Sequence, residues 1–192
     1  MNMESMEQQI IKAAIECIEK YGLSGVTNRR IAEIANINHA AINYYFRSKE
    51  NLITKVMELT VKVVFNPDFF DPQPGVTAKH RCISIFEKMV KGGCDYPEIM
   101  RAHFYGLMNQ NNGDLKILDP YKSFMIWLCK DLSDRGTKLT QEELQLALTQ
   151  IASACFMVVL VPNLNIPDFE IDLRNEEKRH VFVSRLVEKL IA

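Results

Sequence analysis

Residues 27–55 hold the side chains whose types and spacing could do chemistry. Five basic residues stand there against two acidic ones, which gives the segment a net charge of +3 (Arg29, Arg30, Arg47, Lys49 and Lys55 against Glu33 and Glu50). Between them lie hydrogen-bonding side chains, His39, Asn43, Tyr44 and Tyr45, and the small residues Ala40 and Ala41. Asparagine can pair with adenine, alanine can contact a thymine methyl group, and tyrosine or lysine commonly binds phosphate. This combination indicates contact with nucleic acid.

The rest of the chain is slightly acidic. The 192 residues carry a net charge of −1, with −2 in residues 1–26 and −2 in residues 56–192. Such a balance argues against a protein that coats nucleic acid by bulk charge. Positive charge confined to one segment favours local, specific binding, although a solvated charged face is the simpler explanation of such a cluster.

Other chemistries find no support in the sequence. The five cysteines, at positions 17, 82, 94, 129 and 155, include no C-x-x-C pair, so they predict neither a zinc site nor a thioredoxin-like motif. Widely spaced thiols fit a reducing cytoplasm. The H-E-x-x-H, G-x-S-x-G, P-loop and dinucleotide-binding patterns are also absent, so we expect no enzyme, no cofactor and no metal.

No membrane segment is expected either. The N-terminus, MNMESMEQQ, lacks a basic region followed by an apolar one, so no secretory signal is visible. The longest nearly unbroken apolar run, Ile151 to Val161, is about half of the ~20 residues that a spanning helix needs. We interpret this run as a buried helix of a cytoplasmic protein.

The helical periodicity of the sequence predicts the helices that position the basic segment. Thr27 can cap a short helix with Ile31, Ile34 and Ala35 inward, and Asn38 can cap a second one with Ile42 and Phe46 inward. About three residues connect the two, and a long helix is expected on each side. This arrangement is typical of a helix-turn-helix, whose second helix lies in the major groove of DNA. His39, Ala40, Asn43 and Tyr44 would then face outward, unless the tyrosines belong partly to the core.

The whole chain is expected to be all-α. The first helix would be capped by Ser5 and Gln8, would end at Gly22 and would bury one stripe (Ile11, Ala14, Ile15, Ile18 and Tyr21). Three prolines and a glycine in Asn66–Gly75 predict a linker. We therefore expect a domain at 4–64, with the helix-turn-helix at about 27–46, and a larger helical domain at 76–192. Its expected helices are Thr77–Lys91, Pro97–Asn109, Asp114–Arg135, Thr140–Val161 and Glu176–Ile191.

The stretch VTNRRIAEIANINHAAINYYFRSKENLI resembles the signature of the tetracycline-repressor (TetR) family. The matching residues, found without a gap, are Thr27, Arg29, Ile31, Ala32, Ile37, Ile42, Tyr45, Phe46, Ser48, Lys49, Glu50 and Leu52. The chain departs from the pattern at Asn36, where glycine is usual, at Ala40 and at Asn43. Asparagine tolerates the left-handed conformation, so the turn should survive. The resemblance covers about the first third of the chain.

This resemblance implies roles for individual residues. Arg29, His39, Ala41 and Asn43 become the candidates for reading bases, and the candidates for binding phosphates are Thr27, Asn28, Tyr44, Tyr45 and Lys49. The departures at Ala40 and Asn43 lie on the outer face, so they should change the operator sequence rather than abolish binding. Arg30 is either a further contact or merely solvated.

The resemblance further implies that the C-terminal domain forms a homodimer through a four-helix bundle, because two recognition helices together read a palindromic operator. The expected dimer surface is one stripe on each of the last two helices: Ala147, Ile151, Ala154, Cys155, Val158, Phe182 and Leu186. The alternative is that these stripes are intramolecular core.

The same domain would sense a small molecule. The expected pocket residues are His103, Phe104, Met108, Phe124, Trp127 and Met157, which favour an apolar or aromatic effector. Such residues at helical spacing are often plain core. The resulting hypothesis is a ligand-responsive repressor of transcription, and the alternative is a constitutive or architectural DNA-binding protein without an effector.

Overall fold

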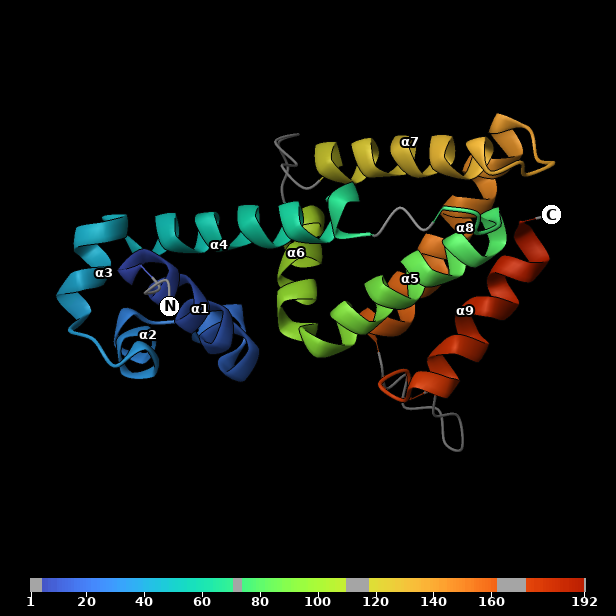
Figure 1. Ribbon diagram of the computed structural model, residues 1–192. Helices are drawn as coiled ribbons and strands as arrows, with labels where there is room; N and C mark the ends of the chain where they lie inside the picture. Colours follow the sequence, from blue (N-terminus) through green and yellow to red (C-terminus); the bar gives the residue numbers. More distant parts are fainter. Residues whose placement is uncertain (1–4, 71–73, 110–117, 162–171, 192) are drawn as a thin grey trace. The chain divides into compact units, whose positions relative to one another are not determined.

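The computed structural model describes residues 5–70, 74–109, 118–161 and 172–191, and all regular structure in these ranges is helical (Figure 1). The α-helices are α1 (Met6–Tyr21), α2 (Asn28–Ala35), α3 (His39–Phe46), α4 (Lys49–Val64), α5 (Ala78–Asp95), α6 (Pro97–Asn109), α7 (Leu118–Asp134), α8 (Gln141–Leu160) and α9 (Glu176–Leu190). Two 3₁₀ turns, η1 (Leu23–Gly25) and η2 (Pro67–Phe69), lie between them. The all-α prediction is confirmed.

The predicted helix ends rest on local hydrogen bonds. Ser5 and Gln8 form a capping box on α1, and Thr140 and Glu143 form another on α8. Gly22 ends α1 with a φ of +67°, a left-handed value that glycine adopts without steric cost. α5 continues through Gly92 and Gly93 to Asp95, four residues beyond the predicted end. The predicted start of the next-but-one helix, Asp114, lies outside the described residues.

Backbone proximity divides the chain into two compact units, and each is described by itself. Unit 1 comprises residues 1–63 and 98–117, and unit 2 comprises residues 64–97 and 118–192. The first division falls beside the end of the domain expected at 4–64. α6 lies in the expected 76–192 domain, yet nearly all of it packs with the N-terminal helices. The limits 4–64 and 76–192 of the DNA-binding and sensing domains stay a prediction.

Unit 1 has an aliphatic core drawn from five helices. α1 contributes Ile10, Ala13, Ala14, Cys17 and Ile18; the other helices contribute Ile31, Ile42, Phe46, Leu52, Val56 and Ile99. The stripe predicted for α1 was partly wrong, because Ile11 and Ile15 are only half-buried and Tyr21 is exposed. Tyr21 instead lies under the Arg30 guanidinium, which is 4.3 Å from the ring centroid.

α6 is fastened to unit 1 by polar contacts as well as by Ile99. The Glu19 carboxylate of α1 accepts hydrogen bonds from the backbone N–H groups of Glu98 (3.2 Å) and Ile99 (2.8 Å). These donors belong to the first turn of α6, where a helix leaves its N–H groups unpaired and favours negative charge. One turn further on, His103 Nε2 lies 2.9 Å from Thr60 Oγ1 of α4.

Unit 2 combines an aromatic cluster with a buried ionic network. α5 contacts α7, α8 and α9, and α8 contacts both α7 and α9. Aromatic rings of the η2 segment, α7 and α8 pack against one another: Phe65, Phe70, Tyr121, Phe124, Trp127 and Phe156. Beside them the Arg81 side chain, only 2% exposed, donates to Asp131 at 3.1 Å and to the Phe70 carbonyl at 3.2 Å. Arg135 donates to the same carboxylate and to the carbonyl of Val76.

α8 is the one helix in the described residues that is long and apolar enough to cross a membrane, with a mean hydropathy of 1.6. By itself this is weak evidence for a membrane span, because core helices of globular proteins have the same character. One face of α8 is buried in unit 2, including Leu144, Leu148 and Ile151. Cys155 is buried there too, and burial raises the pKa of its thiol to about 12, so it stays protonated and behaves as an apolar residue.

Candidate nucleic-acid interface

The turn between α2 and α3 has the predicted geometry. Asn36 ends α2 in the left-handed conformation, with φ 52° and ψ 49°. The backbone N–H of Ile37 donates to the carbonyl of Ala32 at 3.0 Å, which closes the turn. Asn38 then caps α3, because its side-chain oxygen accepts from the N–H of Ala40 at 2.9 Å. Asparagine thus replaces glycine here without loss of the turn.

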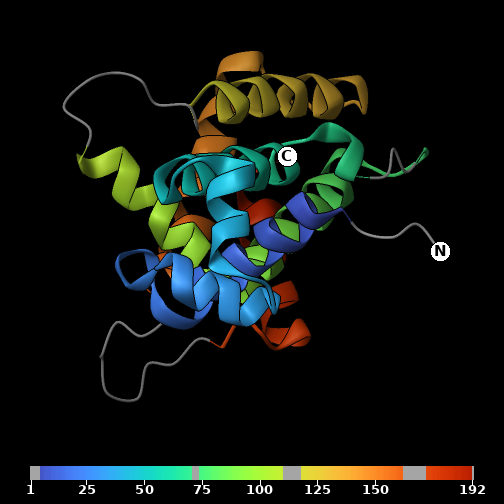
Figure 2. The ribbon, with the colours of Figure 1, turned by 90° about the vertical axis from the view of Figure 1, so that its left-hand side faces the viewer.

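α3 separates a buried face from an exposed one. Ile42 is fully buried and Phe46 is 7% exposed, and both belong to the core of unit 1. The opposite face exposes His39, Ala40 and Asn43, and Ala41 is half-buried. Tyr44 is 82% exposed and Tyr45 is 45% exposed, with their rings edge to face at 5.1 Å, so neither tyrosine is a core residue. Figure 2 turns the blue helices of this unit toward the viewer.

The first turn of α2 lies beside this face. Thr27 caps the helix, since its hydroxyl oxygen accepts from the N–H of Arg30 at 3.3 Å. The side-chain amide of Asn28 donates to the side-chain oxygen of Asn43 at 3.4 Å. Asn28, which is predicted to bind a phosphate, therefore contacts Asn43, which is predicted to contact a base. Arg29 forms an ion pair with Glu33 at 2.9 Å.

Two of the basic residues also hold the fold. Arg30 donates to the carbonyl of Gly25 and covers Tyr21, which fixes the turn before α2, so it is not merely a solvated charge. Periodicity gave no sign of this role, because it depends on a turn and a ring outside α2. The Lys49 ammonium group lies 3.5 Å from the carbonyl of Val26 and its side chain stays 40% exposed. Lys49 therefore lies beside the start of α2 and is still accessible to a phosphate.

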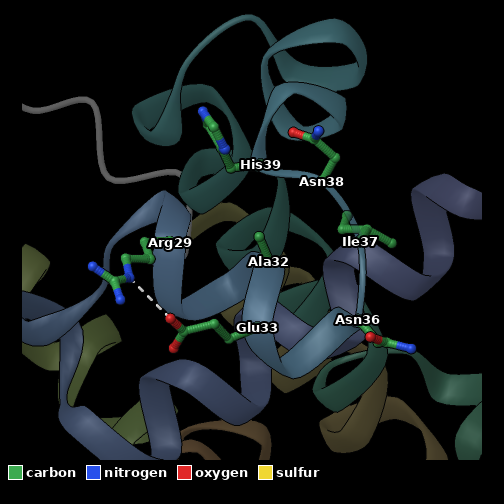
Figure 3. Close-up of a pocket in the computed structure, with 7 residues that line it drawn as sticks. All are labelled: Arg29, Ala32, Glu33, Asn36, Ile37, Asn38 and His39. Carbon is green, nitrogen blue, oxygen red and sulfur yellow. Dashed lines mark hydrogen bonds and ion pairs between the residues drawn. The ribbon is translucent and has the colours of Figure 1, made fainter.

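A shallow hollow opens where α2, the turn and the start of α3 meet (Figure 3). Its volume is about 410 Å³, and it is lined by Arg29, Ala32, Glu33, Asn36, Ile37, Asn38 and His39. Two of these residues, Arg29 and His39, are predicted base readers. The exposed face of α3, the first turn of α2 and this hollow together form the candidate interface.

The expected effector-pocket residues are spread over both units. His103 and Phe104 lie on α6 in unit 1, whereas Phe124, Trp127 and Met157 lie in unit 2, and the side chain of Met108 is outside the described residues. Phe124 is 1% exposed and packs against Phe65, Phe70 and Trp127, while Met157 is 56% exposed. Burial lowers the pKa of His103 to about 4, so this side chain is neutral near pH 7.

The expected dimer residues fall into two groups. Ala147, Ile151 and Cys155 are at most 4% exposed, so their side chains are packed within unit 2. These three residues lie on the stripe that α8 turns toward its own chain, which favours the alternative of intramolecular core. Ala154, Val158, Phe182 and Leu186 are half-buried and retain accessible surface.

Comparisons with known proteins agree with this geometry. Residues 10–56 match the model of the family described as bacterial regulatory proteins, tetR family. The transcriptional regulator RutR of Escherichia coli K12 is 26% identical over 133 residues, which cover 65% of this chain. The chain spans only 61% of the length of this curated relative.

Solved structures show the same fold over the whole chain. A TetR transcriptional regulator from Legionella pneumophila superposes with a TM-score of 0.74 at 20% identity, covering 100% of both chains. The regulator FadR of Bacillus subtilis, solved in complex with stearoyl-CoA, gives a TM-score of 0.68 at 21% identity, with 96% of this chain and 97% of that one covered. The family match falls on the helices that build the candidate interface, and the relatives are regulators rather than enzymes. Residues 10–56 therefore match the helix-turn-helix segment of the tetR family of bacterial regulatory proteins, and the fold resembles that of a TetR transcriptional regulator.

Proposed function

We propose that this protein is a ligand-responsive repressor of the bacterial cytoplasm, which binds a palindromic operator as a homodimer and is released by a small molecule. The observation that carries the proposal is the division of α3 into a face buried in the core and a face of exposed, uncharged hydrogen-bonding groups. On that face we assign His39, Ala41 and Asn43 to bases, together with Arg29 of α2. Thr27, Asn28, Tyr44, Tyr45 and Lys49 bind phosphates on either side.

Dimerisation follows from the size of the recognition helix. α3 has 8 residues, and a single helix of this length contacts too few base pairs to specify a site. Two copies about 34 Å apart would read both halves of a palindrome. Apolar side chains left exposed on α8, at its C-terminal cap and on α9 provide a surface for this: Leu146 (60%), Met157 (56%), Val161 (39%) and Val181 (42%). With Ala154, Val158, Phe182 and Leu186 they form the proposed dimer face.

The dimer face can be tested by one charge substitution and a matched control. Met157→Asp places a carboxylate on the proposed face and should convert the dimer to a monomer in sedimentation velocity, with weaker operator binding. Ile126→Asp is the control, because Ile126 of α7 is similarly exposed (61%) and lies outside this face. A Met157→Asp variant that remains dimeric would contradict this assignment.

The effector is proposed to be apolar or aromatic, the class of ligand that the expected pocket residues favour. Two structural neighbours support this class of ligand, since FadR was solved with stearoyl-CoA and the multidrug-binding protein EbrR (TM-score 0.56) with imidazole. α6 is bonded to α1 through Glu19 and to α4 through His103. A ligand that displaces α6 would therefore displace helices of the DNA-binding unit.

A constitutive DNA-binding protein is the second candidate. It is favoured by the packing of Phe124 and Trp127, whose rings contact Phe70 and each other, so this part of the proposed pocket is filled by side chains. Isothermal titration with stearoyl-CoA and with planar aromatic compounds, followed by operator-binding assays, separates the two candidates. Ligands that bind and weaken operator affinity support the repressor. Ligands that bind and leave operator affinity unchanged support the constitutive protein.

A further inference from the structure

The ion pair between Arg29 and Glu33 on the outer side of α2 leaves hydrogen-bonding groups of both side chains unused within the part of the chain that the structure describes. The Arg29 Nε atom donates to Glu33 Oε1 at 2.9 Å, and the two side chains are 89% and 61% exposed. Because the bond uses Nε, the two terminal nitrogens of Arg29 are left without a partner among the described residues. The second oxygen of Glu33 is unpartnered in the same sense.

The pair lies at the edge of the hollow that also contains the start of α3. Figure 3 shows the bonded Arg29 and Glu33 side chains on the α2 side and His39 at the first residue of α3. In a helix-turn-helix the first turns of the second helix contact base edges in the major groove. The pair therefore lies next to the groove, at the same end of α3 as His39.

The bonded pair matches one base pair in particular. In the major groove a G·C pair presents the guanine N7 and O6 acceptors and then the cytosine N4 donor, in a row. The terminal nitrogens of Arg29 can donate to guanine, and the free oxygen of Glu33 can accept from the cytosine amino group. An A·T pair places a thymine oxygen and a methyl group where the carboxylate would lie, which is unfavourable.

We infer that Arg29 and Glu33 act together to read one G·C pair in each half of the operator, which makes Glu33 a specificity-determining residue. This inference rests on the proposed assignment of α3 to the major groove. The simpler explanation is an exposed i, i+4 pair that only supports the helix and contributes a few tenths of a kcal/mol. If Glu33 has no base partner, its carboxylate only repels the phosphates, and Glu33→Ala should strengthen binding to every duplex alike. If Glu33 reads a cytosine, Glu33→Ala should reduce the discrimination between G·C and A·T at one position.

The test compares DNA duplexes that differ at single base pairs. An operator selected by the wild-type protein is altered by changing each G·C pair of a half-site in turn to A·T, in both halves symmetrically. At one position, the change from G·C to A·T should lower the affinity of the wild type tenfold or more. The same change should lower the affinity of Glu33→Ala by no more than about threefold. Glu33→Gln keeps an acceptor oxygen and should retain part of the preference. Substituting 7-deazaguanine at that position removes N7 and should weaken wild-type binding as well.

Glu16→Ala supplies the matched control, because Glu16 is an exposed carboxylate on α1 away from the hollow. It should change affinity for all duplexes by one common factor. The inference is overturned if Glu33→Ala behaves in the same way, or if no G·C pair shows the selective loss. A wild-type protein that enriches no DNA sequence would instead overturn the proposed function, and the inference with it.

Discussion

Units 1 and 2 are both helical, but they differ in where their characteristic polar side chains lie. In unit 1 these side chains are on the surface, whereas in unit 2 they are inside the core. Unit 1 buries mainly small and aliphatic side chains and leaves the groups that we propose to contact DNA on the exposed faces of α2 and α3. Unit 2 buries Arg81 among aromatic rings and joins it to Asp131 and Arg135. In unit 1, stability and function should therefore respond to different residues. In unit 2, the polar groups are themselves part of the core, so their loss should cost stability.

The largest effect is expected from Asp131→Ala in unit 2. The substitution leaves Arg81, which is 2% exposed, without its carboxylate, and breaking a buried ion pair in this way costs about 3–5 kcal/mol. Urea unfolding measures the loss. Asp134→Ala is the matched control, because Asp134 is exposed on the same helix and should change stability by less than ~0.5 kcal/mol. Equal effects of the two substitutions would show that the network is not part of the core.

Ile42→Ala should be nearly as damaging, for a different reason. Ile42 is fully buried in unit 1, and its truncation should cost roughly 2–5 kcal/mol through lost burial and the cavity left behind. Thermal unfolding followed by circular dichroism checks this. The neighbouring Ala41, half-buried on α3, serves as control, and Ala41→Gly should cost only about 1 kcal/mol, from helix propensity.

His103 should make the stability of the folded chain depend on pH. Its pKa is lowered to about 4 by burial, so between the normal value near 6.5 and pH 4 the unfolded chain binds a proton that the folded chain does not. Stability contributed by neutral His103 is complete above pH 6.5, and it should fall by up to about 1.4 kcal/mol per pH unit as the pH drops toward 4. His103→Gln removes this titration, so its urea-unfolding free energy should depend less steeply on pH in that window. Identical slopes for the two proteins would contradict the burial of His103.

Asn43→Ala should have the smallest effect on stability and a clear effect on DNA recognition. Asn43 is exposed, one residue from Ile42, and its contact with Asn28 is a 3.4 Å hydrogen bond at the surface. The melting temperature should change little, while discrimination at one base pair of the operator should fall about tenfold. Competition binding across an operator library measures it. If discrimination is unaltered at every position, Asn43 is not a base-contacting residue.

The same contrast explains how far the sequence could predict the structure. In the helix-turn-helix the signals are local: Thr27 and Asn38 cap helices within three residues, and Asn36 supplies the left-handed turn, so α2, α3 and the exposed face of α3 were predicted closely. The contacts that were missed join residues of different helices, such as Glu19 of α1 with the first turn of α6 and Arg30 of α2 with Tyr21 of α1. In unit 2 the periodicity showed that α8 has apolar stripes. It could not distinguish the stripe that faces its own chain, which includes Ile151, from the exposed stripe, which includes Met157.

The most direct test of the central claim is selection of bound DNA from random duplexes by the full-length protein. We predict enrichment of a palindrome whose half-sites are centred about one helical turn, or a small multiple of it, apart. Affinity should decrease with salt to an extent that corresponds to a few phosphate contacts per subunit. Failure to enrich any sequence, with binding that depends on salt alone, would contradict the assignment of α3 as the helix that reads the operator.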